Sequence, residues 1–295
     1  MFDAGVSRRR LLATGAALAA GFVTAGCATA KGNSADKVLI PPVGPAAPAS
    51  TAVTSAAPQA IAAPAVDPAA VAAKFAGRQP QGWGMDLDGI RTGFDPSGKQ
   101  FAITFDACGG PNNNDIDENL IAFLQAQQIP ATLFLNKRWI DANNNRAGQL
   151  AANPLFEIGN HGTKHCPLSV TGKAAYDIDG TGSAQEAVDE VWGNHQRIIT
   201  LTGKAPRFFR TGTAHYDDVA VAIVQALGET PVGFSVNADY GATASAATVQ
   251  QNMAAAQSGG ISLAHMHRPK SGTGPGMLNA LPALRSAGFE FVHLP

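Results

Sequence analysis

Charge and cysteine are both scarce in this chain of 295 residues. Charged residues make up 15% and hydrophobic residues 45%, which excludes a coiled coil and a charge-rich disordered chain for most of the length. The 21 basic and 22 acidic residues give a net charge of −1, so there is no excess of positive charge for a phosphate backbone, and we expect no nucleic-acid partner. Three cysteines are too few for a fold built on disulfides.

The amino-terminal segment has the pattern of an export signal. Arg8–Arg10 directly precede an uncharged stretch of 16 residues, Leu11–Gly26, which is typical of a twin-arginine signal. The stretch is shorter than the roughly 20 residues that span a bilayer, so we expect its removal. Its end, Thr24–Cys27, resembles a lipobox and predicts lipidation of Cys27, the alternative being an ordinary cleaved signal. Residues 1–27 therefore predict export to the periplasm or outer cell envelope, with membrane contact only through the signal or a lipid on Cys27.

The next segment is poor in charge and rich in proline and alanine. No charged residue lies between Val38 and Val66, and six prolines interrupt this stretch. Because proline blocks a continuous helix and the segment has little to bury, we predict a disordered spacer over residues 28–78. One globular domain should follow over residues 79–295.

Short apolar runs alternate with helical patterns in that domain. The clearest helical pattern runs from Gln185 to Thr202 and stops at Gly203, and another follows Asp115. Such alternation predicts an α/β fold of parallel βα units, and seven units in about 200 residues favour a closed or nearly closed barrel. The seven runs are Phe101–Phe105, Ala131–Leu135, Phe156–Ile158, Phe208–Phe209, Val232–Val236, Ile261–Ala264 and Phe289–Leu294.

Polar residues follow several of these runs. The carboxyl ends of parallel strands meet at one face, so these side chains should gather at one mouth of the barrel. They are Asp106, Asn160, His161, Arg210, Asn237, Asp239 and His265.

Two histidines are spaced for metal binding. His161 and His165 are four residues apart, and a single helical turn would bring both imidazoles to one side. Imidazole suits Zn, Co, Ni or Fe better than Mg or Ca. The alternative for such a pair is two surface histidines on a loop.

Three further residues could carry acid–base chemistry. Asp106 lies where a strand meets two glycines and could hold a metal or take a proton from water, although a loop-capping role is the alternative. Arg210 could pair with that carboxylate and keep it ionised. His265 and His267 share one side of a strand, so either could be a general acid or a structural histidine. His195 and His293 fit structural positions, and His215 fits a position at the rim of the site.

These motifs resemble the polysaccharide deacetylases with the NodB-homology domain, also called carbohydrate esterase family 4, over roughly Lys99–Pro295. The family's Thr-Phe-Asp-Asp-Gly motif is similar to Thr104–Asp106, after which Ala107 departs from it. Its His-Ser/Thr-x-x-His motif is similar to His161–His165, with Gly162 in place of the hydroxyl residue.

The later motifs of the family are similar in part. Arg-x-Pro-Tyr is matched only by Arg210, because Gly212 and Thr213 stand where proline and tyrosine are expected. The closing Leu-x-His is matched by Leu263 and His265. All the motifs keep the family's order and spacing.

The resemblance implies an incomplete (β/α) barrel of about seven strands and hydrolysis of an N-acetyl group from an amino-sugar polymer or oligomer, with a divalent metal, first of all Zn. It implies that Asp106 is the catalytic base, that His161 and His165 are metal ligands, that Arg210 is the partner of Asp106, and that His265 is the acid. Two alternatives are a non-catalytic glycan-binding lipoprotein on the same fold and a hydrolase of a small amide or cyclic imide.

Ala107 is the main departure from the family, because the family's second aspartate at this position is the third metal ligand. The candidates to replace it are Asp106, Cys108, Asp115 and Asp239, of which we rank Asp106 first because it lies beside the histidine pair. Cys108 and Cys166 flank the two strongest motifs, so a disulfide between them, a thiolate ligand and free thiols are three alternatives.

Overall fold

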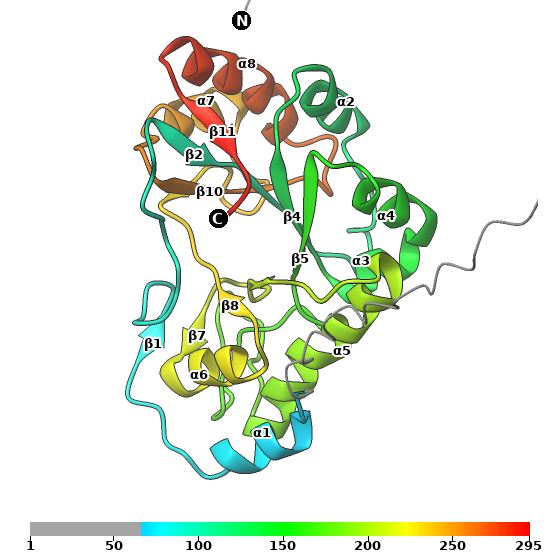
Figure 1. Cartoon of the computed structure of the whole chain (residues 1–295), viewed down its shortest axis with the longest axis vertical. Helices are drawn as coiled ribbons and strands as arrows, with labels where there is room; N and C mark the ends of the chain where they lie inside the picture. Colours follow the sequence, from blue (N-terminus) through cyan, green and yellow to red (C-terminus); the bar gives the residue numbers. More distant parts are fainter. Residues whose placement is uncertain (1–65) are drawn as a thin grey trace, which may run out of the picture. The chain divides into compact units, whose positions relative to one another are not determined.

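The computed structural model describes residues 66–295 (Figure 1). The predicted export signal over residues 1–27 and most of the predicted spacer lie outside the described residues. Within residues 66–295, no helix has the length and apolar character to cross a membrane.

A mostly parallel sheet forms the centre of the fold, which confirms the predicted α/β class. Its order is β11-β2-β10-β3-β4-β5-β6-β8, with β9 paired to β10. The apolar runs predicted from the sequence all contain strand residues, although Val232–Val236 contributes only the start of β9. The strands are β2 (Gln100–Ala102), β3 (Thr104–Ala107), β4 (Ala131–Leu135), β5 (Phe156–Asn160), β6 (Phe208–Phe209), β8 (Thr230–Pro231), β9 (Val236–Asn237), β10 (Gly260–His265) and β11 (Glu290–Val292).

Strand β10 lies along both β2 and β3 in a single register. Gly260 is paired with Phe101 at one end, and His265 is paired with Asp106 at the other. β2 and β3 therefore behave as one strand that is interrupted at Ile103. This register places His265 beside Asp106 at the carboxyl ends of their strands.

Helices cover the sheet, and their ends follow the sequence signals. α5 (Ala184–Thr202) matches the helix predicted over Gln185–Thr202; Ser183 caps its first turn, and Gly203 ends it in the left-handed conformation. The remaining helices next to the sheet are α2 (Glu118–Ala126), α3 (Lys137–Ala142), α4 (Asn144–Ala151), α6 (Asp218–Ala226), α7 (Ala246–Met253) and α8 (Thr273–Ser286).

A further helix lies where the sequence predicted spacer. α1 (Pro68–Phe75) begins after Asp67, whose side chain accepts a hydrogen bond from the amide of Ala69. It buries Phe75 and two smaller side chains in an apolar cluster with residues of α5 and α6. The domain therefore begins before residue 79, because the alanine-rich stretch after Asp67 has one apolar face to bury.

A two-stranded antiparallel sheet lies beside the main sheet. It pairs β1 (Trp83–Gly84) with β7 (Tyr216–Asp217). The hydroxyl group of Tyr216 donates to the carbonyl oxygen of Phe209 at 3.2 Å, which ties this small sheet to the end of β6.

Candidate metal and catalytic site

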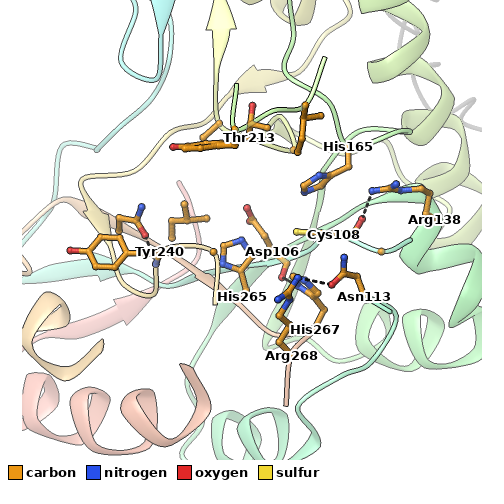
Figure 2. Close-up of a pocket in the computed structure, with 18 of the residues that line it drawn as sticks. Asp106, Cys108, Asn113, Arg138, His165, Thr213, Tyr240, His265, His267 and Arg268 are labelled. Atoms are coloured by element: carbon orange, nitrogen blue, oxygen red, sulfur yellow. Dashed lines mark hydrogen bonds between the residues drawn. The ribbon is translucent and has the colours of Figure 1, made fainter. Parts of the chain in front are cut away.

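A cavity of about 680 Å³ opens at the carboxyl ends of the strands (Figure 2). Its lining includes Asp106 from β3, Cys108 just after β3, His265 from β10, and His165 and His267 from the loops that follow strands. Of the seven residues predicted at one mouth, Asp106, Asn237 and His265 line this cavity. The other four, Asn160, His161, Arg210 and Asp239, do not line it.

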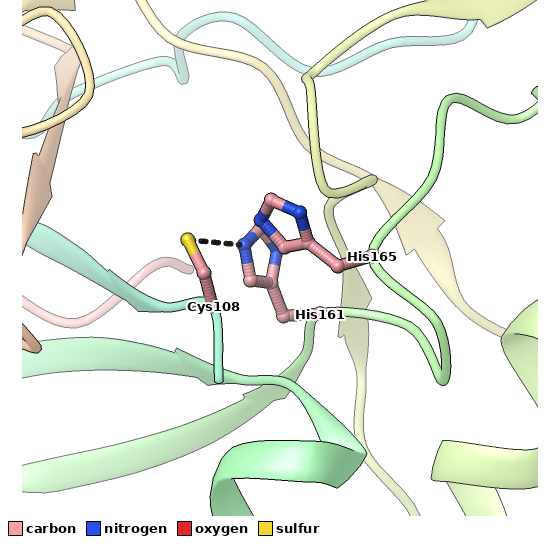
Figure 3. Close-up of side chains that lie close together, drawn as sticks. All are labelled: Cys108, His161 and His165. Atoms are coloured by element: carbon pink, nitrogen blue, oxygen red, sulfur yellow. Dashed lines mark hydrogen bonds between the residues drawn. The ribbon is translucent and has the colours of Figure 1, made fainter. Parts of the chain in front are cut away.

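Cys108, His161 and His165 form a cluster beside this cavity (Figure 3). One potential ligand atom from each of the three lies within 4.8 Å of the other two. The thiol of Cys108 lies 3.8 Å from Nε2 of His161, whose Nδ1 lies 2.9 Å from the carbonyl oxygen of Arg210. That contact fixes the ring so that Nε2 faces the thiol.

Burial controls the protonation of this cluster. It holds the pKa of His161 and of His165 well below the ordinary histidine value, so both rings are neutral near pH 7, the form that binds metals. Burial also raises the pKa of the Cys108 thiol. Nε2 of His165 is buried and has no hydrogen-bond partner among the described residues.

The predicted helical turn between the two histidines is wrong. Residues 161–165 form a loop after β5, and Gly162 and His165 both have positive φ, at 79° and 65°. The carboxylate of Glu190, buried on α5, accepts hydrogen bonds from the amides of residues 163, 164 and 165 at 3.0, 2.7 and 2.9 Å. This carboxylate, rather than helical geometry, brings the imidazole centroids to 4.9 Å.

Sequence reasoning missed Glu190, which carries no signal beyond its place in the helical pattern. It also explains Gly162, because a Cβ atom there would collide with the Glu190 carboxylate. A similar clash explains the glycine at residue 212. A Cβ atom at this position would lie 2.5 Å from Cγ of His165, so the proline of the family motif does not fit.

Asp106 and Arg210 form a buried ion pair at the floor of the cavity. Nη1 of Arg210 donates to Oδ1 of Asp106 at 2.8 Å, and Nη2 donates to the carbonyl oxygen of Gly233 at 2.9 Å. The second carboxylate oxygen of Asp106 lies 3.6 Å from Nε2 of His161. The predicted pairing of Arg210 with Asp106 is therefore present in the structure.

His265 is held by a carboxylate on its other side. Oδ1 of Asp239 lies 2.8 Å from Nδ1 of His265, and Oδ2 accepts the His265 amide and the Thr273 hydroxyl, each at 2.7 Å. Burial alone would lower the pKa of His265, but the adjacent charge of Asp239 raises it well above the ordinary value. His265 is therefore a cation near pH 7, with its ring held between Asp239 and the Cys108 thiol.

Of the four candidates to replace the missing ligand, two lie beside the histidines. Cys108 is in the cluster and Asp106 contacts it, whereas Asp239 is occupied by His265, and Asp115 does not line the cavity. Cys108 and Cys166 are both free thiols, so the alternative of a disulfide between them is excluded in this structure. Ala107 is fully buried in the main apolar core.

The remaining histidines have separate environments. His267 lines the cavity, and burial lowers its pKa to about 4. His195 contacts Glu229 at 2.7 Å in a buried pair, and His293 contacts the carbonyl oxygen of Leu155. His215 lies between the rings of Trp83 and Tyr176 and does not line the cavity.

The fold and this cluster define a barrel-like α/β protein in which two histidines and one thiol lie together beside an aspartate–arginine pair. Residues 94–232 match the model of the polysaccharide deacetylase family, as the motifs in the sequence predict. No curated protein sequence matches the chain.

Solved structures of carbohydrate esterase family 4 have the same fold. A pseudoenzyme of this family from Bacillus anthracis is 21% identical over 71% of this chain and 69% of its own, with a TM-score of 0.59. A peptidoglycan N-acetylglucosamine deacetylase is 22% identical over 70% and 91%, with a TM-score of 0.58. An acetyl xylan esterase from Clostridium thermocellum, solved with a cobalt ion, is 20% identical over 66% and 88%, with a TM-score of 0.55. The predicted fold is thereby confirmed.

Proposed function

We propose that this protein is a metal-dependent hydrolase that removes N-acetyl groups from an amino-sugar polymer or oligomer. The observation that carries this proposal is the meeting of three features at one cavity: the Cys108–His161–His165 cluster, an Asp106 carboxylate oxygen 3.6 Å from Nε2 of His161, and the cationic His265. The family match over residues 94–232 supports the same activity.

The residues present fit a divalent cation. His165 Nε2 is a buried nitrogen that has no hydrogen-bond partner within residues 66–295. One potential ligand atom from each of His165, His161 and Cys108 lies within 4.8 Å of the other two. His161, His165 and Cys108 would hold the ion, and this set of nitrogen and sulfur donors suits Zn, with Co, Ni or Fe as alternatives. When bound, such an ion polarises an acetamide carbonyl group and lowers the pKa of water.

The other residues divide the proton transfers between them. Arg210 fixes one oxygen of Asp106, which leaves Oδ2 to take a proton from the attacking water. Asp239 holds Nδ1 of His265 and keeps the ring protonated, so Nε2 can donate its proton to the departing amine. Asp106 is thus the base, His265 is the acid, and Arg210 is a positioning residue.

The test is acetate release from N-acetylglucosamine oligomers and from peptidoglycan by the Zn-loaded full chain. We expect turnover that chelation abolishes and that Asp106→Asn lowers at least a hundredfold, because the amide cannot take the proton. Lys204→Gln, a change at an exposed lysine that does not line the cavity, is the matched control. Full activity of Asp106→Asn would refute the assigned base.

A second candidate function is non-catalytic glycan binding. Ala107 favours it, because the family's third ligand is missing, and the similar fold of a pseudoenzyme shows that the barrel can persist without activity. Purified protein that retains glycans without stoichiometric metal or acetate release would establish it. A small-amide hydrolase would instead release acetate from small amides and not from glycans.

We further propose that the chain is exported and tethered through a lipid on Cys27, on the strength of Arg8–Arg10 and the lipobox-like Thr24–Cys27. Metabolic labelling with a fatty-acid analogue should mark the native chain and not Cys27→Ala. Equal labelling of both chains would contradict the tether.

A further inference from the structure

Positive charge surrounds the cavity mouth without a matching carboxylate. The lining includes Arg138, Lys164 and Arg268, whereas its one carboxylate is Asp106, which is paired with Arg210. None of the three cations forms an ion pair with any residue in the range 66–295. Figure 2 shows Arg138 and Arg268 approaching the cavity from different sides.

Neutral acceptors hold both arginines in place. Nη2 of Arg268 donates to Oδ1 of Asn113 at 2.9 Å. Nε of Arg138 donates to Oδ1 of Asn136, and its Nη2 donates to the carbonyl oxygen of Cys108, both at 3.2 Å. Because these partners are uncharged, the guanidinium groups are oriented without being neutralised. Preorganised cations of this kind suit a bound carboxylate.

This concentration of charge is local, because the whole chain carries a net charge of −1. A concave site lined by one sign of charge attracts ligands of the opposite sign. The same cavity is lined by Tyr176 and Tyr240, which are 70% and 54% exposed and offer flat surfaces for sugar rings. The cavity therefore combines features for a polymer of sugars with features for negative charge.

We propose that the substrate is an acidic N-acetylated glycan whose carboxylates lie against Arg138, Lys164 and Arg268. This inference rests on the proposed deacetylase function and narrows its substrate class. The carboxylates of such a glycan come from two chemical sources, a lactyl ether on the amino sugar or a neighbouring uronic acid. A neutral N-acetylglucosamine polymer lacks the group that these cations recognise.

The first experiment measures acetate release by the Zn-loaded full chain from matched glycans. The acids are peptide-free peptidoglycan strands with lactyl carboxylates and oligosaccharides of alternating N-acetylglucosamine and glucuronate, and each is compared with its own methyl ester. We expect kcat/KM to be at least tenfold higher for one acid than for its ester. The acid that shows this difference identifies the chemical source of the carboxylate. Added salt should reduce the ratio, because exposed charges are screened. Equal rates for both acids and their esters would overturn the proposal.

Substitutions at the cationic residues then test which of them recognise the carboxylate. Arg268→Gln and Lys164→Gln, both changes at exposed residues, should each lower the acid-to-ester ratio roughly three- to tenfold, and the double variant more. Lys204→Gln should leave the ratio unchanged. A ratio that persists in the double variant would also overturn the proposal.

Direct binding separates this proposal from the proposed function. Calorimetry with the same acids and esters reports recognition without turnover. Tighter, salt-sensitive binding of an acid than of its ester, without acetate release, would refute the proposed deacetylase activity and support an acidic glycan as the ligand. Acetate release together with equal binding of acids and esters would support the proposed deacetylase activity and refute the preference for an acidic glycan.

Discussion

Ala107 separates two side chains that face the cavity, Asp106 and Cys108. Successive side chains of a strand point to opposite faces, so residue 107 faces the core while its neighbours face the site. A carboxylate at residue 107 would therefore lie among apolar groups in this chain. The thiol two residues after Asp106 is the group that the strand directs to the histidine pair.

We accordingly expect Ala107→Asp, which restores the family motif, to reduce stability instead of completing the metal site. Burying a carboxylate without a partner should lower the free energy of unfolding by about 3 kcal/mol or more, as measured in urea. Cys108→Asp, which places the same carboxylate on the cavity side, is the matched comparison and should cost much less. A stable Ala107→Asp protein with raised Zn affinity would contradict this assignment.

At the scale of elements, α5 determines the shape of the loop that carries the histidines. Glu190 presents two oxygens to three consecutive amides, and Thr163 donates from its hydroxyl group to the Glu190 carbonyl oxygen at 2.8 Å. The helix therefore supports the histidines of the Cys108–His161–His165 cluster without lining the cavity.

Glu190→Gln should weaken this support, because an amide offers one acceptor oxygen where the carboxylate offers two. We expect Zn affinity, measured by competition with a coloured chelator, to fall roughly tenfold, within the usual range for groups that orient ligands. Glu186→Gln, an exposed change on the same helix, should leave the affinity unchanged. Equal affinity in both variants would show that the loop holds its shape without Glu190.

For the molecule as a whole, α1 extends the folded domain to residues that resemble spacer in sequence. Phe75 is buried against the α5–α6 side of the barrel, whereas Val66, just before the helix, is exposed. We expect Phe75→Ala to lower the free energy of unfolding by about 3 kcal/mol in a denaturant titration. Val66→Ala should change it by less than about 0.5 kcal/mol. Similar values for the two variants would mean that α1 adds no stability.

A buried carboxylate should make the stability of the domain depend on pH. Burial raises the pKa of Glu229 to about 7, while hydrogen bonds from His195 and Asn160 oppose this shift. The folded state therefore binds this proton more tightly than the unfolded state, in which the pKa is about 4.3. The resulting stability is complete below about pH 4.3 and is lost as pH rises to about 7.

The loss amounts to about 3–4 kcal/mol, at 1.36 kcal/mol for each unit of pKa shift. Urea unfolding of Glu229→Gln at a series of pH values should lack this decline, whereas Glu290→Gln, at an exposed residue, should retain it. An identical pH profile for the wild-type chain and Glu229→Gln would contradict the assignment.

The sequence by itself determined the alternation of strands and helices, the bounds of α5, and the position of Asp106, His161, Arg210 and His265 at the carboxyl ends of their strands. These features follow from local patterns: apolar runs, a serine cap, a terminal glycine, and the rule that parallel strands end at one face. The family motifs added the expected roles of these residues, which stay predictions.

Only the tertiary structure decided how the site is assembled. Glu190 contacts the loop from 25 to 27 residues further along the chain, Asp239 reaches His265 across 26 residues, and α1 packs on helices more than a hundred residues away. Whether residue 107 or residue 108 faces the histidine pair depends on which face of β3 packs against the core. Such contacts join residues that are distant in sequence, and no local pattern encodes a partner that folding alone brings near.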